Sequence, residues 1–243
     1  MIRIGTAGWS IPAVVRDRFP EGPSILARYA QIFDAVEINS SFYRPHKPQT
    51  YARWAATTPE GFRFAVKIPK SITHDRRLVD VEEPLDRFLA ETAALGPKRG
   101  PMLIQLPPSL TFDPGVADRF LAVLRERHDG EAVLEPRHKT WFAPEASALM
   151  RRHRIARVAA DPPAGAAETN PGGWDGLQYW RLHGSPRMYA SAYGEDRLNA
   201  LAARLRSPAW VVFDNTMLGA ATEDALILQA ILRGRTPDAK VRP

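Results

Sequence analysis

The chain of 243 residues contains no cysteine. Disulfide bonds, thiolate metal sites and cysteine nucleophiles are therefore excluded. It also lacks any apolar run near the roughly 20 residues that span a bilayer. Its start, MIRIGTAGWS, has no long apolar core of the kind found in a secretory signal. Neither a P-loop nor a G-x-S-x-G pattern occurs, so ATP hydrolysis and α/β-hydrolase chemistry have no motif behind them. These absences predict a soluble cytoplasmic protein.

What the chain does contain is an ordinary globular mixture, with 44% hydrophobic and 25% charged residues. Such a mixture can bury a sizeable core. No tandem repeat or low-complexity tail divides the chain, so we expect a single domain over residues 1–243. The formal net charge of +6 favours acidic partners.

Eight short apolar segments, most of them flanked by Pro, Gly or Asp, are typical of strands buried on both faces. They cover residues 2–8, 35–39, 62–68, 101–106, 132–137, 155–160, 177–184 and 209–215. Strands that alternate with helices in this number predict an α/β protein with a (β/α)8 TIM-barrel-like fold. An open doubly wound sheet is the alternative, but it usually shows a glycine-rich first turn that GTAG is too short to supply.

Helical patterns lie between these segments at 22–33, 82–95 and 113–126. The last one opens with Asp113 as the predicted N-cap and Pro114 in the first helical position. Residues 161–176 carry Pro and Gly but no helical stripe, so we expect an irregular sixth crossover.

Each predicted strand from the second onward ends in polar residues. These are Glu37, Asn39, Lys67, Gln105, Glu135, Arg137, Asp161, Tyr179, Arg181, His183, Asp214 and Asn215. Residues i and i+2 of a strand share a face, and barrel active sites gather at the carboxyl ends of strands. An unpaired buried polar group costs about 1–3 kcal/mol. We therefore expect these side chains to converge on one polar pocket.

The loops after these strands mix basic and aromatic residues. Windows 40–47, 68–77, 136–143 and 184–193 contain Arg44, Lys47, Lys70, Arg76, Arg77, Arg137, Lys139 and Arg187 against one acid, Asp75. Basic groups neutralise phosphates, and aromatic rings stack on bases or sugars. Acidic residues follow strands six and eight instead, namely Asp161, Glu168, Asp175 and Asp214. This polarised layout predicts a phosphate-bearing ligand with a neutral or cationic end.

Several stretches carry a family resemblance: IGTAGWS, VEINSSFYR, GFRFAVKIPKSITHDRRL, QLPPS, EPRHKTWF and RLHG. Over nearly its whole length the chain resembles the YecE-like family, the domain of unknown function seventy-two. The resemblance implies a TIM-barrel-like fold with a pocket at the strand ends, and it implies no established activity. Its link to endonuclease-type and xylose-isomerase-type barrels is an analogy of fold. The stretch VVFDNT and the long loop 161–176 depart from the family pattern, so Asp214 and Asp161 are not expected to be general family features.

Acid–base chemistry would fall on Glu37, Glu135 and His183. An ordinary histidine titrates near pH 6.5, and the two glutamates could act as a carboxylate pair. The alternatives are a hydrogen-bonded structural histidine and a Glu135 that is ion-paired to Arg137 or Arg181.

A divalent metal held by Glu135, Asp161, His183 and Asp214 is a further possibility for the strand ends. Two arginines would lie beside that cation and repel it, so no metal or other cofactor is predicted.

The predicted ligand contacts are Trp9, Asn39, Phe42, Tyr43, Lys67, His74, Arg76, Gln105, Arg137, His138, Trp141, Arg181 and Asn215. The predicted partner is an anionic small molecule or a nucleic acid, in the latter case with phosphodiester hydrolysis as a potential activity, and no membrane. One alternative is a sugar or sugar-phosphate isomerase or hydrolase that uses Glu37 and His183 as acid and base. The other is a non-catalytic accessory protein whose basic rim docks on a partner.

Overall fold

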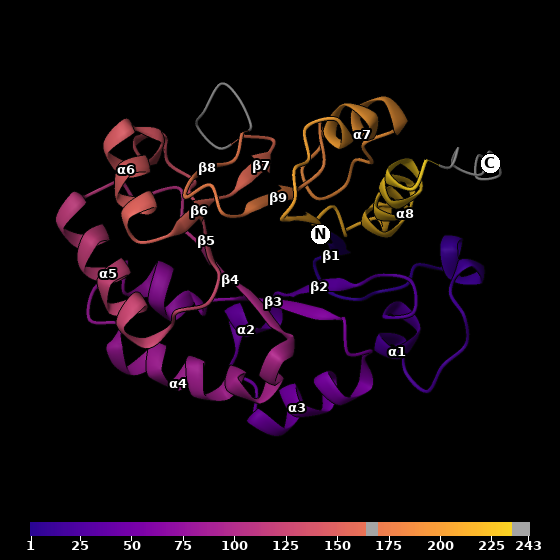
Figure 1. The fold of residues 1–243 in the computed structure, drawn as a ribbon, viewed down its shortest axis with the longest axis horizontal. Coiled ribbons are helices and arrows are strands. Elements are labelled where there is room, and N and C mark those ends of the chain that lie inside the picture. The colour runs from indigo at the N-terminus through magenta and orange to yellow at the C-terminus, as the bar shows by residue number, and fades with distance from the viewer. Residues whose placement is uncertain (164–169, 235–243) are drawn as a thin grey trace.

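The computed structural model describes residues 1–163 and 170–234. Strands and helices alternate along most of the chain (Figure 1). The strands are β1 (Ile2–Thr6), β2 (Ala35–Ile38), β3 (Arg63–Lys67), β4 (Arg99–Gln105), β5 (Ala132–Glu135), β6 (Ile155–Arg157), β7 (Ala159–Asp161), β8 (Gly172–Gly173), β9 (Gln178–Leu182) and β10 (Ala209–Phe213). Glu168, one of the predicted acidic loop residues, lies outside the described residues.

The α-helices are α1 (Ile25–Tyr29), α2 (Ser40–Tyr43), α3 (Pro48–Thr57), α4 (Glu82–Thr92), α5 (Pro114–Arg127), α6 (Pro144–Arg152), α7 (Glu195–Ala202) and α8 (Ala220–Leu232). Short helical turns are η1 (Ala13–Arg18), η2 (Ser71–Asp75), η3 (Ala93–Lys98) and η4 (Lys139–Phe142). No helix in residues 1–163 or 170–234 is both long enough and apolar enough to cross a membrane.

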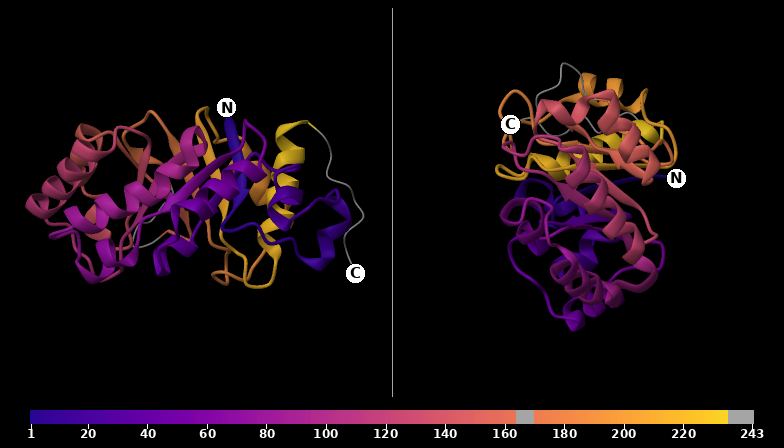
Figure 2. Two further views of the ribbon diagram at one scale, coloured as in Figure 1. Left: turned by 90° about the horizontal axis from the view of Figure 1, so that it is seen from below. Right: turned by 90° about the vertical axis from the view of Figure 1, so that its left-hand side faces the viewer.

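The strands form two sheets. One has the order β1-β10-β9-β7 and is parallel, and the other has the order β2-β3-β4-β5-β6-β8. Because β1 pairs with β10, the first strand lies in the sheet of the last part of the chain. In Figure 1 and in the right-hand view of Figure 2, the orange and yellow C-terminal part lies above most of the indigo to magenta N-terminal part.

Two joints connect the sheets. At the first, Ala7 forms a single parallel bridge with Glu37. At the second, β6 and β7 follow each other with only Val158 between them; β6 pairs with β5, whereas β7 pairs with β9. The prediction of one uninterrupted strand over 155–160 is therefore wrong, because the chain changes its pairing partner at Val158. The result is an α/β fold with parallel and mixed sheets, and the strand pairing of the described residues is not continuous around the molecule.

The irregular sixth crossover contains a strand that the sequence did not predict. β8 runs antiparallel to β6, so the second sheet is mixed. Gly173 has a positive φ of 66°, and a Cβ there would lie 2.6 Å from the carbonyl oxygen of Ile155. Only glycine allows this close approach of the two backbones.

The strands bury both faces. One face packs with the helices in the larger hydrophobic core. The opposite face forms a smaller apolar cluster of Ala35, Ala65, Leu103, Val133, Ala156, Val158, Leu177, Tyr179, Trp210 and Val212. Two positions after Ala35, Ala65 and Val133 on the same face come Glu37, Lys67 and Glu135. Polar side chains therefore continue the apolar cluster at the carboxyl ends of the strands.

The predicted helices form with some changes of length. Asp113 caps α5, since its Oδ1 accepts a hydrogen bond of 2.9 Å from the amide of Val116, and this prediction is confirmed. The helix expected at 22–33 is only α1, which Ser24 caps and which ends at Tyr29. Ile25, its first residue, is apolar but 58% exposed.

Candidate functional site

The side chain of Arg181, on β9, is 1% exposed and contacts three carboxylates. Its Nε and Nη2 donate to Glu37 Oε2 and Oε1 at 3.1 and 2.8 Å. Its Nη1 donates to Glu135 Oε2 at 2.7 Å, and Nη2 also donates to Asp214 Oδ2 at 3.0 Å. One planar guanidinium therefore ties together the ends of β2, β5, β9 and β10, a role that suits its fixed fork of donors.

His183 extends this arrangement toward Arg137. Its Nδ1 lies 2.9 Å from Asp214 Oδ2, and its Nε2 lies 2.9 Å from both Glu135 Oε1 and Arg137 Nη2. Arginine can only donate. If Nε2 accepts from Arg137, the ring's proton is on Nδ1 and points to Asp214. If Nε2 instead carries the proton and donates it to Glu135, this proton and the N–H of Arg137 are two donors that point at each other. The two protonation states of His183 therefore favour different positions of Arg137.

We call this group the strand-end cluster; its members are Glu37, Glu135, Arg137, Tyr179, Arg181, His183 and Asp214. Tyr179 joins it because its hydroxyl donates to Glu37 Oε2 at 2.8 Å. Burial opposes ionisation of Glu135, but the guanidiniums of Arg181 and Arg137 hold its pKa well below the usual range. Burial likewise opposes ionisation of Asp214, and Arg181 and His183 lower its pKa. The cluster therefore holds charged carboxylates in a buried place.

Lys67, at the end of β3, lies beside this cluster and is 7% exposed. Its Nζ sits 4.1 Å from the centre of the Phe42 ring, a cation–π contact. No Asp or Glu oxygen of residues 1–163 and 170–234 lies within 4.0 Å of this nitrogen. Burial first, and the charge of Arg181 second, lower the pKa of Lys67 to about 8, against the opposite effect of the cluster carboxylates. Lys67 is thus a buried amine without a close counter-charge.

Phe42 connects Lys67 with the loop after β3. The His74 ring lies edge-on to Phe42 with 4.9 Å between the ring centres. Burial and the charge of Lys67 lower the pKa of His74. The predicted contacts Phe42, Lys67 and His74 therefore do lie together, on one side of the cluster.

Three other predicted contacts have different partners. Asn215 donates to Asp224 Oδ2 at 2.7 Å and to the Ser191 carbonyl at 2.9 Å. Trp141 is buried in the core, and its indole N–H donates to the Leu110 carbonyl at 2.9 Å. The Nδ1 of His138 lies 2.9 Å from Thr140 Oγ1 and caps η4. Their contacts hold loops and helices together, so the geometry gives no support to the prediction that these three contact a ligand.

The remaining predicted contacts lie around the cluster or away from it. Gln105 is in register with Glu135 at the end of β4, and the Oδ1 of Asn39 is buried without a partner among the described residues. Both stay predictions as ligand contacts. Trp9 packs edge-on against Trp54 with 5.0 Å between ring centres. Tyr43 is 73% exposed, and exposed Arg76 donates to the Asp80 carbonyl at 2.8 Å; none of these three forms a hydrogen bond or ion pair with a described residue of the cluster.

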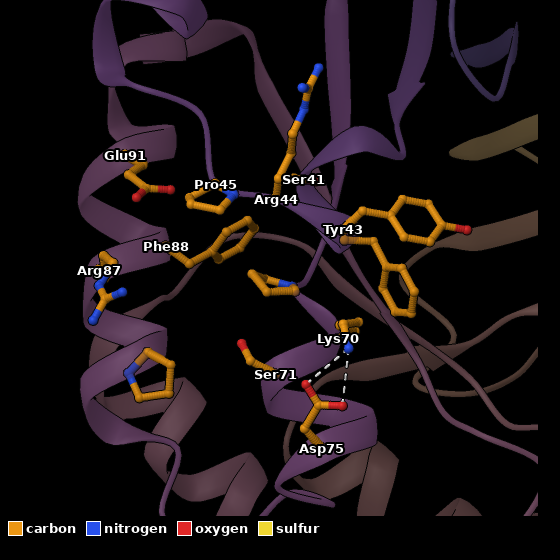
Figure 3. Close-up of a pocket in the computed structure, with 13 residues that line it drawn as sticks. Ser41, Tyr43, Arg44, Pro45, Lys70, Ser71, Asp75, Arg87, Phe88 and Glu91 are labelled. Atoms are coloured by element: carbon orange, nitrogen blue, oxygen red, sulfur yellow. Dashed lines mark hydrogen bonds and ion pairs between the residues drawn. The ribbon is translucent and has the colours of Figure 1, made fainter.

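A pocket of about 180 Å³ lies next to this region, between α4 and the segments that follow β2 and β3 (Figure 3). Its apolar lining consists of Phe42, Pro45, Pro69, Pro84 and Phe88. Lys70 and Asp75 form an ion pair of 3.3 Å at its edge. Phe42 thus both lines the pocket and contacts Lys67, the lysine beside the cluster.

The oxygen atoms that would attract a metal are already directed at cations. Glu135 and Asp214 both point oxygens at Arg181, and no group of three His, Asp or Glu side chains suited to a metal occurs among residues 1–163 and 170–234. The cluster in this arrangement is built for ion pairing, and the prediction that no cofactor is needed stays a prediction.

Tyr179 and Asp214 were among the polar residues expected to converge at the strand ends, but neither was among the predicted catalytic residues or ligand contacts. Both follow the same-face rule, since Tyr179 precedes Arg181 by two positions and Asp214 follows Val212 by two. Tyr189 was not among the predicted site residues, yet its ring lies edge-on to His183 with 5.7 Å between centres.

Fold and cluster together define an α/β protein that collects charged side chains at the carboxyl ends of mainly parallel strands. The family model described as "Protein of unknown function DUF72" matches residues 3–243, and the chain belongs to this family. This finding confirms the resemblance to the YecE-like family.

Two curated relatives carry the YecE-like names. UPF0759 protein YecE of Escherichia coli is 37% identical over 114 residues, which are 47% of this chain and 40% of that protein. UPF0759 protein YunF of Bacillus subtilis is 30% identical over 154 residues, which are 59% of this chain and 53% of that protein. The chain thus aligns with about half the length of these relatives or less.

Solved structures share the fold over almost the whole chain. A DUF72 family protein from Thermotoga maritima is 26% identical with a TM-score of 0.80, covering 96% of this chain and 99% of that one. A DUF72 family protein from Enterococcus faecalis is 21% identical with a TM-score of 0.81, covering 100% and 99%. SacUVDE, 10% identical with a TM-score of 0.60 and coverage of 96% and 99%, shares the fold alone.

Proposed function

We propose that the strand-end cluster and Lys67 bind a small anionic ligand that carries a phosphate group. We also infer that the two sheets form one barrel-like wall in a single domain, with β6 and β7 sharing the sixth position. The pairing of β1 with β10 and the bridge between Ala7 and Glu37 support this arrangement. In such a wall the carboxyl ends of the strands surround one site.

The observation that carries the proposal is the unused binding capacity of two buried cations. The side chain of Arg137 is 8% exposed; its Nη2 pairs with Glu135 Oε1 at 2.7 Å, whereas its Nε is buried with no hydrogen-bond partner among the described residues. The Nζ of Lys67 lies over the Phe42 ring, and no Asp or Glu oxygen of the described residues lies within 4.0 Å of it. A bound phosphate would supply acceptors to both, and charge-assisted hydrogen bonds of this kind are the stronger ones.

The strand order supports binding of one ligand by both cations. Lys67 ends β3, Arg137 follows β5, and β4 lies between them. Two strand spacings separate the backbones by about 10 Å, which two long side chains on the same face can bridge around a phosphate. The half-buried Gln105 lies between them on β4.

Catalysis, if it accompanies binding, falls more readily on His183 than on Glu37. Both oxygens of Glu37 already accept from Arg181, and one also accepts from Tyr179. Glu37 therefore orients Arg181. His183 lies between two carboxylates, as an acid–base group in a sugar-phosphate enzyme would.

A nucleic acid is the second candidate ligand, and one observation favours it. The loop residues Arg44, Lys47, Lys139 and Arg187 are exposed and all positive. A strand lying across this rim would meet them before it reached the cluster.

The experiment is isothermal titration calorimetry with ribose 5-phosphate, with ribose as the uncharged comparison. We expect Arg137→Gln and Lys67→Met each to weaken ribose 5-phosphate binding at least tenfold, and Lys67→Arg to retain most of it because the charge is kept. The matched control is Arg44→Gln, an exposed loop arginine whose loss should leave the affinity within twofold.

Thermal unfolding of each variant separates lost binding from lost folding. Unchanged ribose 5-phosphate affinity in folded Arg137→Gln and Lys67→Met would contradict the proposed site. Equal binding of ribose and ribose 5-phosphate would contradict the role of the phosphate.

A further inference from the structure

Lys67 differs from the other lysines that the structure describes. Lys47, Lys70 and Lys139 are exposed, and Lys70 is paired with Asp75. Lys98 donates to the Ala55 carbonyl at 2.6 Å. Lys67 alone among them is buried at a strand end with its amine on an aromatic ring. This environment does not fix the amine in an ion pair.

The charges around Lys67 make its neutral form accessible. Arg181 from β9 and His74 from η2 face it as cationic or titratable groups, and Glu37, Glu135 and Asp214 face it from β2, β5 and the end of β10. With a pKa of about 8, about a tenth of this amine is neutral at pH 7. Lysines that act as nucleophiles are activated in the same two ways, by desolvation and by a neighbouring cation.

We propose that Lys67 traps a carbonyl group, its Nζ forming an imine with an aldehyde or ketone of the phosphate-bearing ligand. This inference rests on the proposed anion site: Arg137 would keep the phosphate while the neutral form of Lys67, which no longer forms a charged contact with it, reaches the carbonyl. The nitrogen lone pair adds to the carbonyl carbon, the C=O bond opens, and the oxygen leaves as water with both amine protons. A C=N bond replaces C=O, and no oxidant or reductant takes part.

The arrangement of the residues around Lys67 suits imine formation. The Phe42 ring covers one side of the amine and limits its hydration. Ser41, next to it on α2, donates from its hydroxyl to the Lys67 carbonyl at 2.7 Å and so fixes the backbone from which the side chain extends. The amine is therefore positioned by α2, and the ligand would approach from the side of the cluster.

The test uses glycolaldehyde phosphate, a two-carbon aldehyde with a phosphate, and reduction of any imine with cyanoborohydride. Peptide mapping by mass spectrometry then locates the modified lysine in the full chain. We expect modification at Lys67 to exceed that at Lys70 and Lys139 at least tenfold, and inorganic phosphate to suppress it. Uncharged glycolaldehyde should modify Lys67 with much less preference.

Two variants distinguish this inference from the proposed binding function. Lys67→Arg should give no adduct at this position, whereas Lys70→Arg should leave both the ribose 5-phosphate affinity and the adduct at Lys67 unchanged. Ribose 5-phosphate binding with no preferential adduct at Lys67 overturns the imine alone. Loss of preference together with absent phosphate binding overturns both, and an adduct that phosphate does not suppress overturns the link between them.

Discussion

At the scale of single residues, Arg181 balances charges that would otherwise be stranded in the interior. Glu37 and Glu135 are fully buried; Arg181 pairs with both of them, and Arg137 Nη2 lies a further 2.7 Å from Glu135 Oε1. A buried ion pair is weak evidence of net stabilisation, because desolvation offsets much of the attraction. Removal of one partner is different, since it leaves the other charge buried and unpaired.

We therefore predict that Arg181→Met lowers the free energy of unfolding by about 3–5 kcal/mol. Urea denaturation followed by circular dichroism measures this. The control is Arg3→Met, because Arg3 pairs with Asp34, whose side chain is 42% exposed and can return to water. Its loss should cost about 1 kcal/mol or less. Equal effects of the two substitutions would show that burial of the carboxylates does not decide the outcome.

At the scale of elements, Asp224 fastens α8 to the loop that covers His183. The amide of Tyr193 donates to both Asp224 oxygens at 3.2 Å, and Asn215 donates to one of them. The same loop carries Tyr189, whose ring contacts His183. Burial raises the pKa of Asp224 to about 6. The loop over the cluster is thus held by a carboxylate that titrates near neutral pH.

This raised pKa makes stability depend on pH in a defined direction. Between about pH 4 and 6 the folded protein holds a proton on Asp224 that the unfolded chain has released, so this group's contribution to stability falls as pH rises. The quantity to compare is the unfolding free energy of Asp224→Asn minus that of the wild type. We predict that this difference increases by about 3 kcal/mol from pH 4 to pH 6.

Urea denaturation at several pH values from 4 to 7 measures this difference. Asp196→Asn, an exposed aspartate on α7, is the control and should show a difference that does not change with pH. A constant difference for Asp224→Asn as well would mean that the pKa of Asp224 is the same in the folded and the unfolded protein.

Single elements were predictable where the signal is local. Asp113 followed by Pro114 predicted the start of α5 because the cap hydrogen bond joins residues three apart. The break at Val158 was not predictable, because it depends on the spatial neighbours β5 and β9 rather than on residues 155–161 themselves. β8 was missed for the same reason, since two glycines carry no strand propensity of their own.

At the scale of the whole molecule, the same distinction governs the site. Alternation along each strand was enough to predict that Glu37, Glu135 and Arg181 would follow apolar residues on a shared face. It could not show that Arg181 pairs with Glu37, which lies 144 positions away. Nor could it show that Asn215 and Trp141 would be engaged elsewhere, because their partners are set by how helices and loops pack on the strands.

The size of the ligand that the protein accepts depends on the whole molecule, and the salt dependence of the binding constant distinguishes a small ligand from a large one. The side chains of Lys67 and Arg137 are less than 10% exposed, which suits the binding of one phosphate group. The exposed basic loops would instead suit a polyanion. Each phosphate of a single strand that is neutralised contributes about −0.7 to the slope of log K against log salt. We predict a slope of about −1 or shallower for ribose 5-phosphate, and no tighter binding of a ten-nucleotide single strand.

Replacing Arg44, Lys47, Lys139 and Arg187 together by glutamine tests the rim directly, since all four are exposed and none belongs to the cluster. If the ligand is small, this variant keeps its ribose 5-phosphate affinity within about twofold, because the Debye length of about 8 Å at physiological salt screens charges at the rim from a ligand among the strand ends. If instead the ten-nucleotide strand binds more tightly than ribose 5-phosphate, with a slope near −3 that the fourfold variant abolishes, the exposed loops are the binding surface. The buried cations would then serve the fold, and the small-ligand proposal would be wrong.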